Sequence, residues 1–168
     1  MADASSIFRN KFKKYISSLK DTSYDSINDK YLCQNSTQEV YNFDLIVKDR
    51  NPLKQPSSFD SLLIYDYDVY CIEFKNQKHS DIDGTQIKNK LIYGKNNIQK
   101  RDYKFIYCVV YKNCTPHYNR FKCGILKGMP RFNLEECKEK GVVKDIFTED
   151  VNFFIKAFKK KILKELKC

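Results

Sequence analysis

Asp60, Glu73 and Lys75 are the residues whose types and spacing are best suited to chemistry. Two apolar runs, residues 59–65 and 69–74, flank a short Asp-Tyr-Asp segment, a pattern that predicts a β-hairpin. A tight turn centred on that segment would put Asp60 directly across from Glu73, with their Cβ atoms about 5 Å apart. Because side chains alternate along a strand, Glu73 and Lys75 share one face. Two carboxylates and one ammonium group are therefore expected to converge.

Such a pair of carboxylates indicates a metal site. Two negative groups this close repel each other unless a cation lies between them. Carboxylate oxygens are hard ligands that suit Mg²⁺ or Mn²⁺. We therefore expect Asp60 and Glu73 to hold one of these ions. The other interpretation is that both acids are strand-end charges facing water, with Lys75 as a solvent-exposed partner of Glu73 that contributes less than about 1 kcal/mol. Asp66 and Asp68 are interpreted as turn residues.

The elements that position these residues follow from hydrophobic periodicity. Strands are predicted at residues 40–48, 59–65, 69–74, 104–111 and 120–127, and helices at 5–19, 85–100, 133–140 and 149–167. Residues 20–38 are expected to form a loop that has room for a short helix. Thr85 is a candidate cap for the second helix, and Gly94 weakens that helix by about 1 kcal/mol relative to Ala. The length of 168 residues fits one domain, residues 1–168. The fold class is α/β, with a small mixed sheet flanked by helices.

The order α-β-β-β-α-β, with an acid on the second strand and Glu-x-Lys on the third, resembles the PD-(D/E)XK nuclease superfamily over about residues 5–111. The resemblance implies a restriction-endonuclease-like core and a hydrolase that cuts phosphodiester bonds with Mg²⁺ or Mn²⁺. It implies that Asp60 and Glu73 are metal ligands, that the backbone carbonyl of Phe74 completes the inner shell, and that Lys75 orients or helps to deprotonate the attacking water. The chemistry requires the same residue types apart from any resemblance. Phosphodiester hydrolysis needs an activated nucleophile and positive charge, which metal ions and a lysine supply.

Some positions depart from the superfamily pattern. Many members carry a further Glu on the first helix, whereas no Glu precedes Glu39 in this chain. Asp21, Asp25 and Glu39 are the candidates for that ligand, and Glu39 is favoured. Gln77 follows Lys75 by two positions, as in the branches with Glu-x-Lys-x-Gln, and is a candidate for positioning a phosphate or a water.

The net charge of +10 predicts attraction to polyanions such as nucleic acid. The helix after Glu-x-Lys flanks the cleft in this superfamily, so its basic residues are expected to contact phosphates. These are Lys88, Lys90, Lys95, Lys100 and Arg101. The alternative is a solvated helix face. DNA is favoured over RNA as substrate, and a homodimer would allow both strands of a duplex to be cut.

Seven cysteines without a Cys-x-x-Cys pair favour a reducing, intracellular compartment, cytoplasm or nucleus, over a disulfide framework. The spacing of Cys114, His117 and Cys123 matches no strong zinc template. The sequence contains no run of 18 apolar residues, so no membrane-spanning helix is expected. Its first residues lack the basic-then-apolar pattern of a signal peptide. Abundant Lys, Asn, Ile and Tyr indicate an AT-rich genome, such as that of a virus or a parasite.

Two other functions remain open at this point. One is a nuclease-like module that binds nucleic acid or a protein without cutting, which the missing helix Glu favours. The other is an RNA-cutting endonuclease of the type found at the start of some viral polymerases. His79 does not precede the acids, as the catalytic histidine of those enzymes does. A loop histidine such as His79 is most simply solvated.

Overall fold

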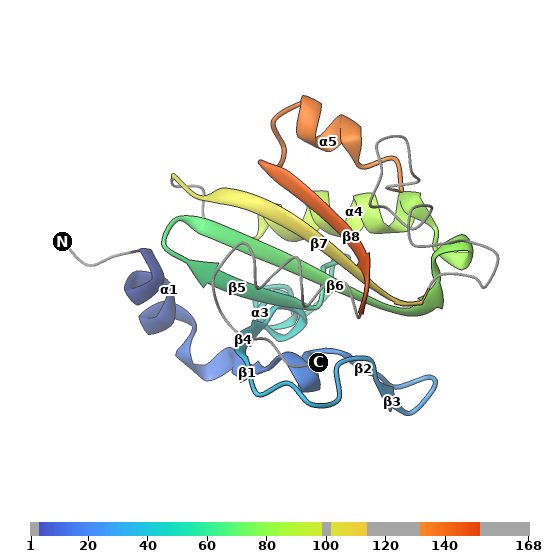
Figure 1. Ribbon diagram of the computed structural model, residues 1–168. Helices are drawn as coiled ribbons and strands as arrows, with labels where there is room; N and C mark the ends of the chain where they lie inside the picture. The colour runs from blue at the N-terminus through green and yellow to red at the C-terminus, as the bar shows by residue number, and fades with distance from the viewer. Residues whose placement is uncertain (1–3, 99–101, 114–131, 152–168) are drawn as a thin grey trace.

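The computed structural model of the chain describes residues 4–98, 102–113 and 132–151 (Figure 1). Its centre is a six-stranded mixed sheet in the order β1-β4-β5-β6-β7-β8. The strands are β1 (Ile16–Ser18), β4 (Glu39–Asn42), β5 (Ser61–Tyr65), β6 (Asp68–Lys78), β7 (Lys104–Asn113) and β8 (Asp145–Asp150). A separate two-stranded hairpin consists of β2 (Tyr24–Asp25) and β3 (Lys30–Tyr31). The predicted α/β class with a mixed sheet is confirmed.

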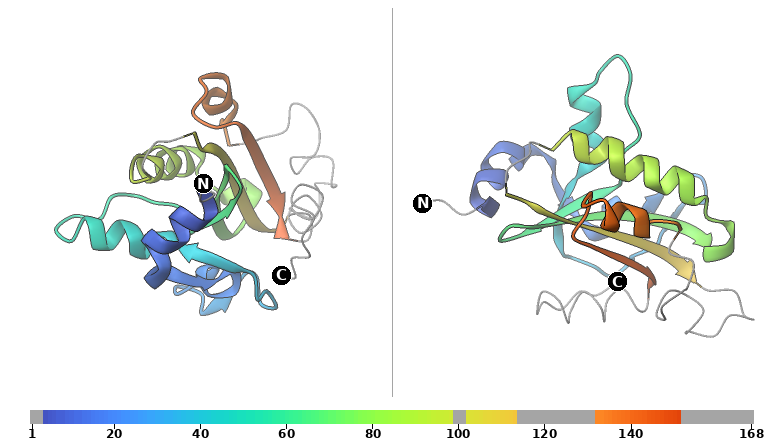
Figure 2. Two further views of the ribbon diagram at one scale, coloured as in Figure 1. Left: turned by 90° about the vertical axis from the view of Figure 1, so that its left-hand side faces the viewer. Right: turned by 90° about the horizontal axis from the view of Figure 1, so that it is seen from above.

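Helices lie against this sheet (Figure 2), and short helical turns precede β1 and follow β6. The α-helices are α1 (Ala4–Phe12), α2 (Leu19–Thr22), α3 (Phe43–Arg50), α4 (Gly84–Asn96) and α5 (Glu135–Glu139), and the 3₁₀ turns are η1 (Lys13–Tyr15) and η2 (His79–Asp81). Helix α4 joins β6 to β7, which run parallel, as a crossover connection requires. No helix in the described part of the chain is long and apolar enough to cross a membrane.

The β5–β6 hairpin forms as the sequence predicts. Tyr65 pairs with Asp68 across a two-residue turn, and Ser61 pairs with Ile72 in the same antiparallel register. Asp66 adopts a φ of 53°, a left-handed conformation that Asp tolerates in turns. The register carried one step further puts Asp60 opposite Glu73.

Two apolar clusters pack on the two faces of the sheet. Val69, Cys71 and Tyr107 belong to the cluster that also contains residues of α1, α3 and α4. Tyr70 and Ile72 belong to the second cluster, which includes Leu19 of α2. The alternation along β6 therefore continues to Glu73, which faces the same side as α4.

The first predicted strand, residues 40–48, is wrong beyond Asn42. The chain turns there into α3, because the Asn42 side chain accepts a hydrogen bond from Leu45 N at 3.1 Å and caps the helix. Phe43, Ile46 and Val47 are all buried, at the spacing of one helical face. An apolar run rich in Ile and Val favoured a strand, but tertiary packing favours the helix.

The first predicted helix, residues 5–19, is also wrong in its second half. Helix α1 ends at Phe12, and Ile16 pairs with Tyr41 in the sheet. The predicted loop at 20–38 holds part of α2 and the β2–β3 hairpin. The edge strand β1 has only three residues, which are too few for an alternating pattern to be recognised in the sequence.

The C-terminal third of the chain is only partly described. Helix α5 confirms a short helix within 133–140, and β8, which was not predicted, pairs parallel with β7. Residues 149 and 150 belong to β8, so the helix predicted at 149–167 does not begin where expected. The remainder of that helix and the strand predicted at 120–127 lie outside the described residues.

Cys71, Cys108 and Cys137 are buried free thiols that pack as small apolar side chains. Cys33 is disulfide-bonded, which departs from the expectation of reduced thiols throughout.

Candidate functional site

Asp60 lies just before β5 and is fixed by three hydrogen bonds. Its backbone N–H donates to Ile72 O at 3.0 Å, and its backbone carbonyl accepts from Phe43 N at 3.0 Å. Its Oδ2 atom accepts from Phe74 N at 2.6 Å. The carboxylate is therefore held against β6, with 18% of its side chain exposed.

Glu73 is fully buried on β6 and is surrounded by cations. Its Oε1 atom lies 2.8 Å from Lys90 Nζ and 3.2 Å from Lys75 Nζ. Lys90 Nζ also lies 4.0 Å from Asp60 Oδ1, so one ammonium group contacts both acids. The other oxygen, Glu73 Oε2, is buried without a hydrogen-bond partner in the described part of the chain. The predicted convergence of Asp60, Glu73 and Lys75 is present, with Lys90 as a fourth member.

Helix α4 brings Lys90 to this position. Ile87 and Leu91 are buried against the sheet, and Gln86 and Lys90 lie four residues apart beside that apolar stripe. Gly94 sets the close approach of the helix, because a Cβ atom there would lie 2.7 Å from the ring of Phe59. The glycine that weakened the helix prediction is thus a packing requirement.

The start of α4 differs slightly from the prediction. Asp83, not Thr85, is the cap: its side chain accepts from Thr85 N at 2.8 Å and from Gln86 N at 3.4 Å. This cap fixes the first turn of the helix, which carries Gln86 to the site.

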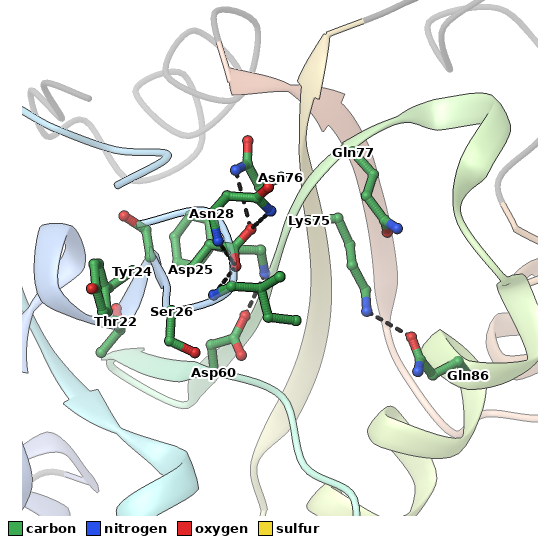
Figure 3. A pocket seen from close by; sticks show the side chains of 13 residues that line it. Thr22, Tyr24, Asp25, Ser26, Asn28, Asp60, Lys75, Asn76, Gln77 and Gln86 are labelled. Carbon is green, nitrogen blue, oxygen red and sulfur yellow. Dashed lines mark hydrogen bonds between the residues drawn. The ribbon is translucent and has the colours of Figure 1, made fainter. Parts of the chain in front are cut away.

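Lys75 is held by partners from two elements. Besides Glu73, its ammonium group donates to Gln86 Oε1 at 2.7 Å, as Figure 3 shows. Only 14% of the Lys75 side chain is exposed, yet the residue lines a pocket together with Asp60. The lysine is therefore oriented beside Glu73 and accessible from the pocket that Asp60 also lines.

Burial and the charges of neighbouring groups shift the pKa values of this site. Removal from water raises the pKa of Glu73, and the ammonium groups of Lys90 and Lys75 oppose that rise. Burial and the charge of Glu73 raise the pKa of Asp60 well above its ordinary value. Burial would lower the pKa of Lys90, but the two carboxylates outweigh it and raise the pKa. The two lysines thus offset only part of the effect of burial on the two acids.

Asp44 is a further acid near the site that the sequence reading missed. It lies in the first turn of α3, where Ser58 Oγ donates a hydrogen bond to its Oδ1 atom. Burial raises the pKa of Asp44, and its charge acts on both Asp60 and Lys90. The misassigned strand at 40–48 concealed this placement.

A pocket of about 420 Å³ opens beside Asp60 and Lys75 (Figure 3). One wall comes from the end of β6 and the start of α4, and the other from Thr22–Asn28. Gln77 lines the first wall and makes no hydrogen bond within the described residues, so its amide is available to a ligand. Volumes of about 300–1,000 Å³ are usual for small-ligand sites.

Glu39 does not join the site and is corrected as a metal candidate. Its carboxylate pairs with Arg9 at 2.6 Å, and β4 carries it away from Asp60, because the Asp60 end of β5 pairs with Asn42 at the other end of β4. Of its two alternatives, Asp21 accepts from Ser18 Oγ at 2.7 Å, whereas Asp25 lines the same pocket as Asp60.

The basic residues predicted to contact phosphates have other partners. Lys88 pairs with Glu136 of α5, and Lys95 donates to the carbonyl of Val142. Lys90 points into the acid pair instead of outward. Lys100 and Arg101 lie outside the described residues.

The donor set at this site fits a single hard cation. The described residues contain no group of three or more His, Cys, Asp or Glu that could hold a metal. Two carboxylates suffice for Mg²⁺, which keeps several waters and is often held by one or two carboxylates and substrate phosphates. The unpartnered Glu73 Oε2 atom is the observation that favours such an ion. The Cys114, His117 and Cys123 group lies outside the described residues.

Comparison of the chain with protein-family models, with curated proteins and with solved structures finds no match.

Proposed function

We propose that this protein is a metal-dependent nuclease that hydrolyses phosphodiester bonds, with DNA slightly preferred over RNA. The observation that carries the proposal is the cluster of Asp60, Glu73 and Lys75 at the edge of an open pocket. The resemblance of these residues to the PD-(D/E)XK pattern, together with the net charge of +10, supports nucleic acid as the substrate.

Asp60 and Glu73 would hold one Mg²⁺ or Mn²⁺ ion, with the backbone carbonyl of Phe74 as a further candidate ligand. The bound ion would supply positive charge and an activated water. The described residues contain no group of three or more potential metal ligands, which favours one ion over two.

Lys75 is the residue proposed to act on the substrate directly. Glu73 and Gln86 hold its side chain, so little freedom is lost when it meets a phosphate. Its ammonium group would stabilise the negative charge that builds up on the phosphate oxygens, or orient the attacking water. Gln77, further along the same strand, would contact a neighbouring phosphate or a water.

Lys90 is assigned a positioning role. Its ammonium group contacts both acids and opposes the rise in their pKa values that burial causes. It reaches them through the interior and does not line the pocket. We therefore expect it to maintain the ligands and not to contact the substrate.

A cleavage panel tests the proposal. Single-stranded, duplex and branched DNA and RNA are incubated with Mg²⁺, Mn²⁺ or chelator, using the wild type and Asp60→Ala, Glu73→Ala and Lys75→Ala. We expect metal-dependent cleavage that each substitution abolishes while nucleic-acid affinity persists. Cleavage at the wild-type rate by any variant would remove that residue from the mechanism.

A non-catalytic binding module is the second candidate, and one observation favours it. Lys90 already neutralises Glu73 at 2.8 Å, so the acid pair is partly compensated by the protein's own cation. Calorimetric titration with Mn²⁺, with and without nucleic acid, separates the two functions. No binding at millimolar metal would favour the module.

A further inference from the structure

The pocket beside Asp60 has a second wall that the nuclease pattern does not account for. Residues Thr22–Asn28, which include the first strand and the turn of the β2–β3 hairpin, form this wall. The hairpin lies outside the six-stranded sheet (Figure 1). It makes no contribution to the acid pair, so its place at the pocket calls for another role.

The hairpin is held firmly in that place. Asp25 accepts from Asn76 Nδ2 of β6 at 3.1 Å, and in its own turn from Ile27 N at 2.9 Å and Asn28 Nδ2 at 2.6 Å. These donors lower the pKa of Asp25. The carboxylate is thereby engaged in fixing the turn and stays ionised, so this wall of the pocket suits a base or a sugar and not a phosphate.

The turn and strands of this hairpin expose apolar and aromatic groups. Ile27 at the turn is 93% exposed, and Tyr24 and Tyr31 are 45% and 37% exposed. The two tyrosine rings lie 4.9 Å apart, centroid to centroid, and the ammonium group of Lys20 lies 5.0 Å over the Tyr31 ring. Aromatic rings beside a cation are the surface on which unpaired bases stack in single-strand-binding proteins.

We propose that this pocket is a subsite for one unpaired nucleotide next to the scissile phosphate, and that Tyr24 and Tyr31 stack the bases that follow. The inference rests on the proposed function and defines its substrate class: a single strand, or a duplex with an unpaired tail. Gln77, whose amide makes no hydrogen bond to any described residue, would read a base edge, because amides pair with the exposed edges of unstacked bases. Ile27 would pack against the base or sugar.

A continuous duplex does not satisfy this arrangement. Its bases are paired and stacked on each other, so their faces cannot meet the tyrosines without unpairing. We therefore expect a preference for unpaired over paired nucleic acid.

Binding in chelator tests this without cleavage. Fluorescence anisotropy of labelled oligonucleotides gives the affinity of the full chain for single-stranded DNA and RNA and for blunt duplexes of the same sequence. We expect a single strand to bind more tightly than its duplex. The double substitution Tyr24→Ala/Tyr31→Ala should weaken single-strand binding about fivefold or more, the lower limit for stacking on aromatic side chains.

Matched controls come from exposed residues elsewhere in the chain. Tyr67→Ala, in the β5–β6 turn, removes a ring that is 53% exposed and should leave the affinity unchanged. Ile27→Ser, at a side chain with little buried contact, should weaken single-strand binding, while Leu53→Ser should not. Equal affinity for single strand and duplex, or a double variant that matches Tyr67→Ala, would overturn the inference.

The same oligonucleotides incubated with Mg²⁺ or Mn²⁺ separate this inference from the proposed function. If the protein cuts but its single-strand affinity does not change on substitution of Tyr24 and Tyr31, the nuclease proposal stands and the subsite proposal fails. A protein that binds single strands through these residues but never cuts keeps the subsite, and the nuclease proposal fails.

Discussion

The ammonium group of Lys90 lies 2.8 Å from Oε1 of Glu73, whose side chain is fully buried. Among the described residues, it is the cation closest to this carboxylate. A buried carboxylate without a partner carries a large desolvation cost. Lys75, at 3.2 Å, shares this task but also lines the pocket. The two lysines thus have different roles. Lys90 compensates the charge of Glu73 from the interior, and Lys75 lines the pocket in which we propose that the substrate binds.

Replacing Lys90 by Met should destabilise the protein. Removing one partner of a buried pair leaves the other charge uncompensated, which costs about 3–5 kcal/mol, and the remaining contact with Lys75 favours the lower limit. Urea unfolding at neutral pH in chelator measures the change. Lys88→Met is the matched control, because its pair with Glu136 is more exposed and solvent screening leaves it a small contribution. Equal stability of the two variants would show that Lys90 does not compensate Glu73.

The acid pair should give the free energy of unfolding an unusual pH dependence. Asp60 and Glu73 have pKa values raised in the folded state, so the folded protein binds their protons more tightly than the unfolded chain. Their contribution to stability is fully present below the unfolded pKa values of 3.8 and 4.5 and is lost as pH rises through the folded values.

Other carboxyls act in the opposite direction, as Glu136, with a pKa of about 2, loses its stabilising charge in acid. The comparison is therefore made with the double variant Asp60→Asn/Glu73→Gln in chelator. The unfolding free energy of the wild type minus that of the variant should increase as pH falls from neutral toward 4.5. A constant or decreasing difference would contradict the raised pKa values.

The hairpin that carries the acids was predictable because its information is local. Alternation along residues 59–74 and a short polar turn fix the register, and Asp60 follows from it. Lys90 was not predictable as part of the site, since its direction depends on how α4 packs on the sheet. That packing depends on Gly94 and Phe59, which are distant in sequence.

The positions of Asp44 and of the pocket wall could not be predicted either, because they too depend on tertiary contacts. The run at residues 40–48 has the composition of a strand, and only the Asn42 cap and the buried face of α3 decide for a helix. The wall at Thr22–Asn28 has no hydrophobic period at all. One of the contacts that place it beside Asp60, from Asn76 to Asp25, joins residues 51 positions apart, and no local pattern predicts such a contact.

Lys75→Met should reduce cleavage by about a hundredfold or more without loss of fold. Removing one preorganised group that stabilises transition-state charge typically costs about 10²–10³ in rate. Single-turnover cleavage of a labelled oligonucleotide measures it. Lys78→Met is the control, since Lys78 is exposed further along the same strand. A rate near that of the control would assign Lys75 to ion pairing alone.

Gly94→Ala should destabilise the protein even though Ala is the better helix former by about 1 kcal/mol. The new Cβ atom would lie 2.7 Å from Phe59 Cε1, and that ring is stacked on Phe43 at 4.3 Å, so it cannot move freely. Overpacking of this kind costs about 1–3 kcal/mol. Asn89→Ala, at an exposed position of α4, controls for helix propensity.

The second substitution Phe59→Leu should relieve the clash, so that Gly94→Ala costs less in that background than in the wild type. Cleavage should follow the same order, because α4 carries Gln86 and Lys90 to the acids. Urea unfolding and single-turnover cleavage of the four proteins of this cycle measure both effects. Additive changes in the unfolding free energy would mean that Gly94 does not set the approach of α4 to Phe59.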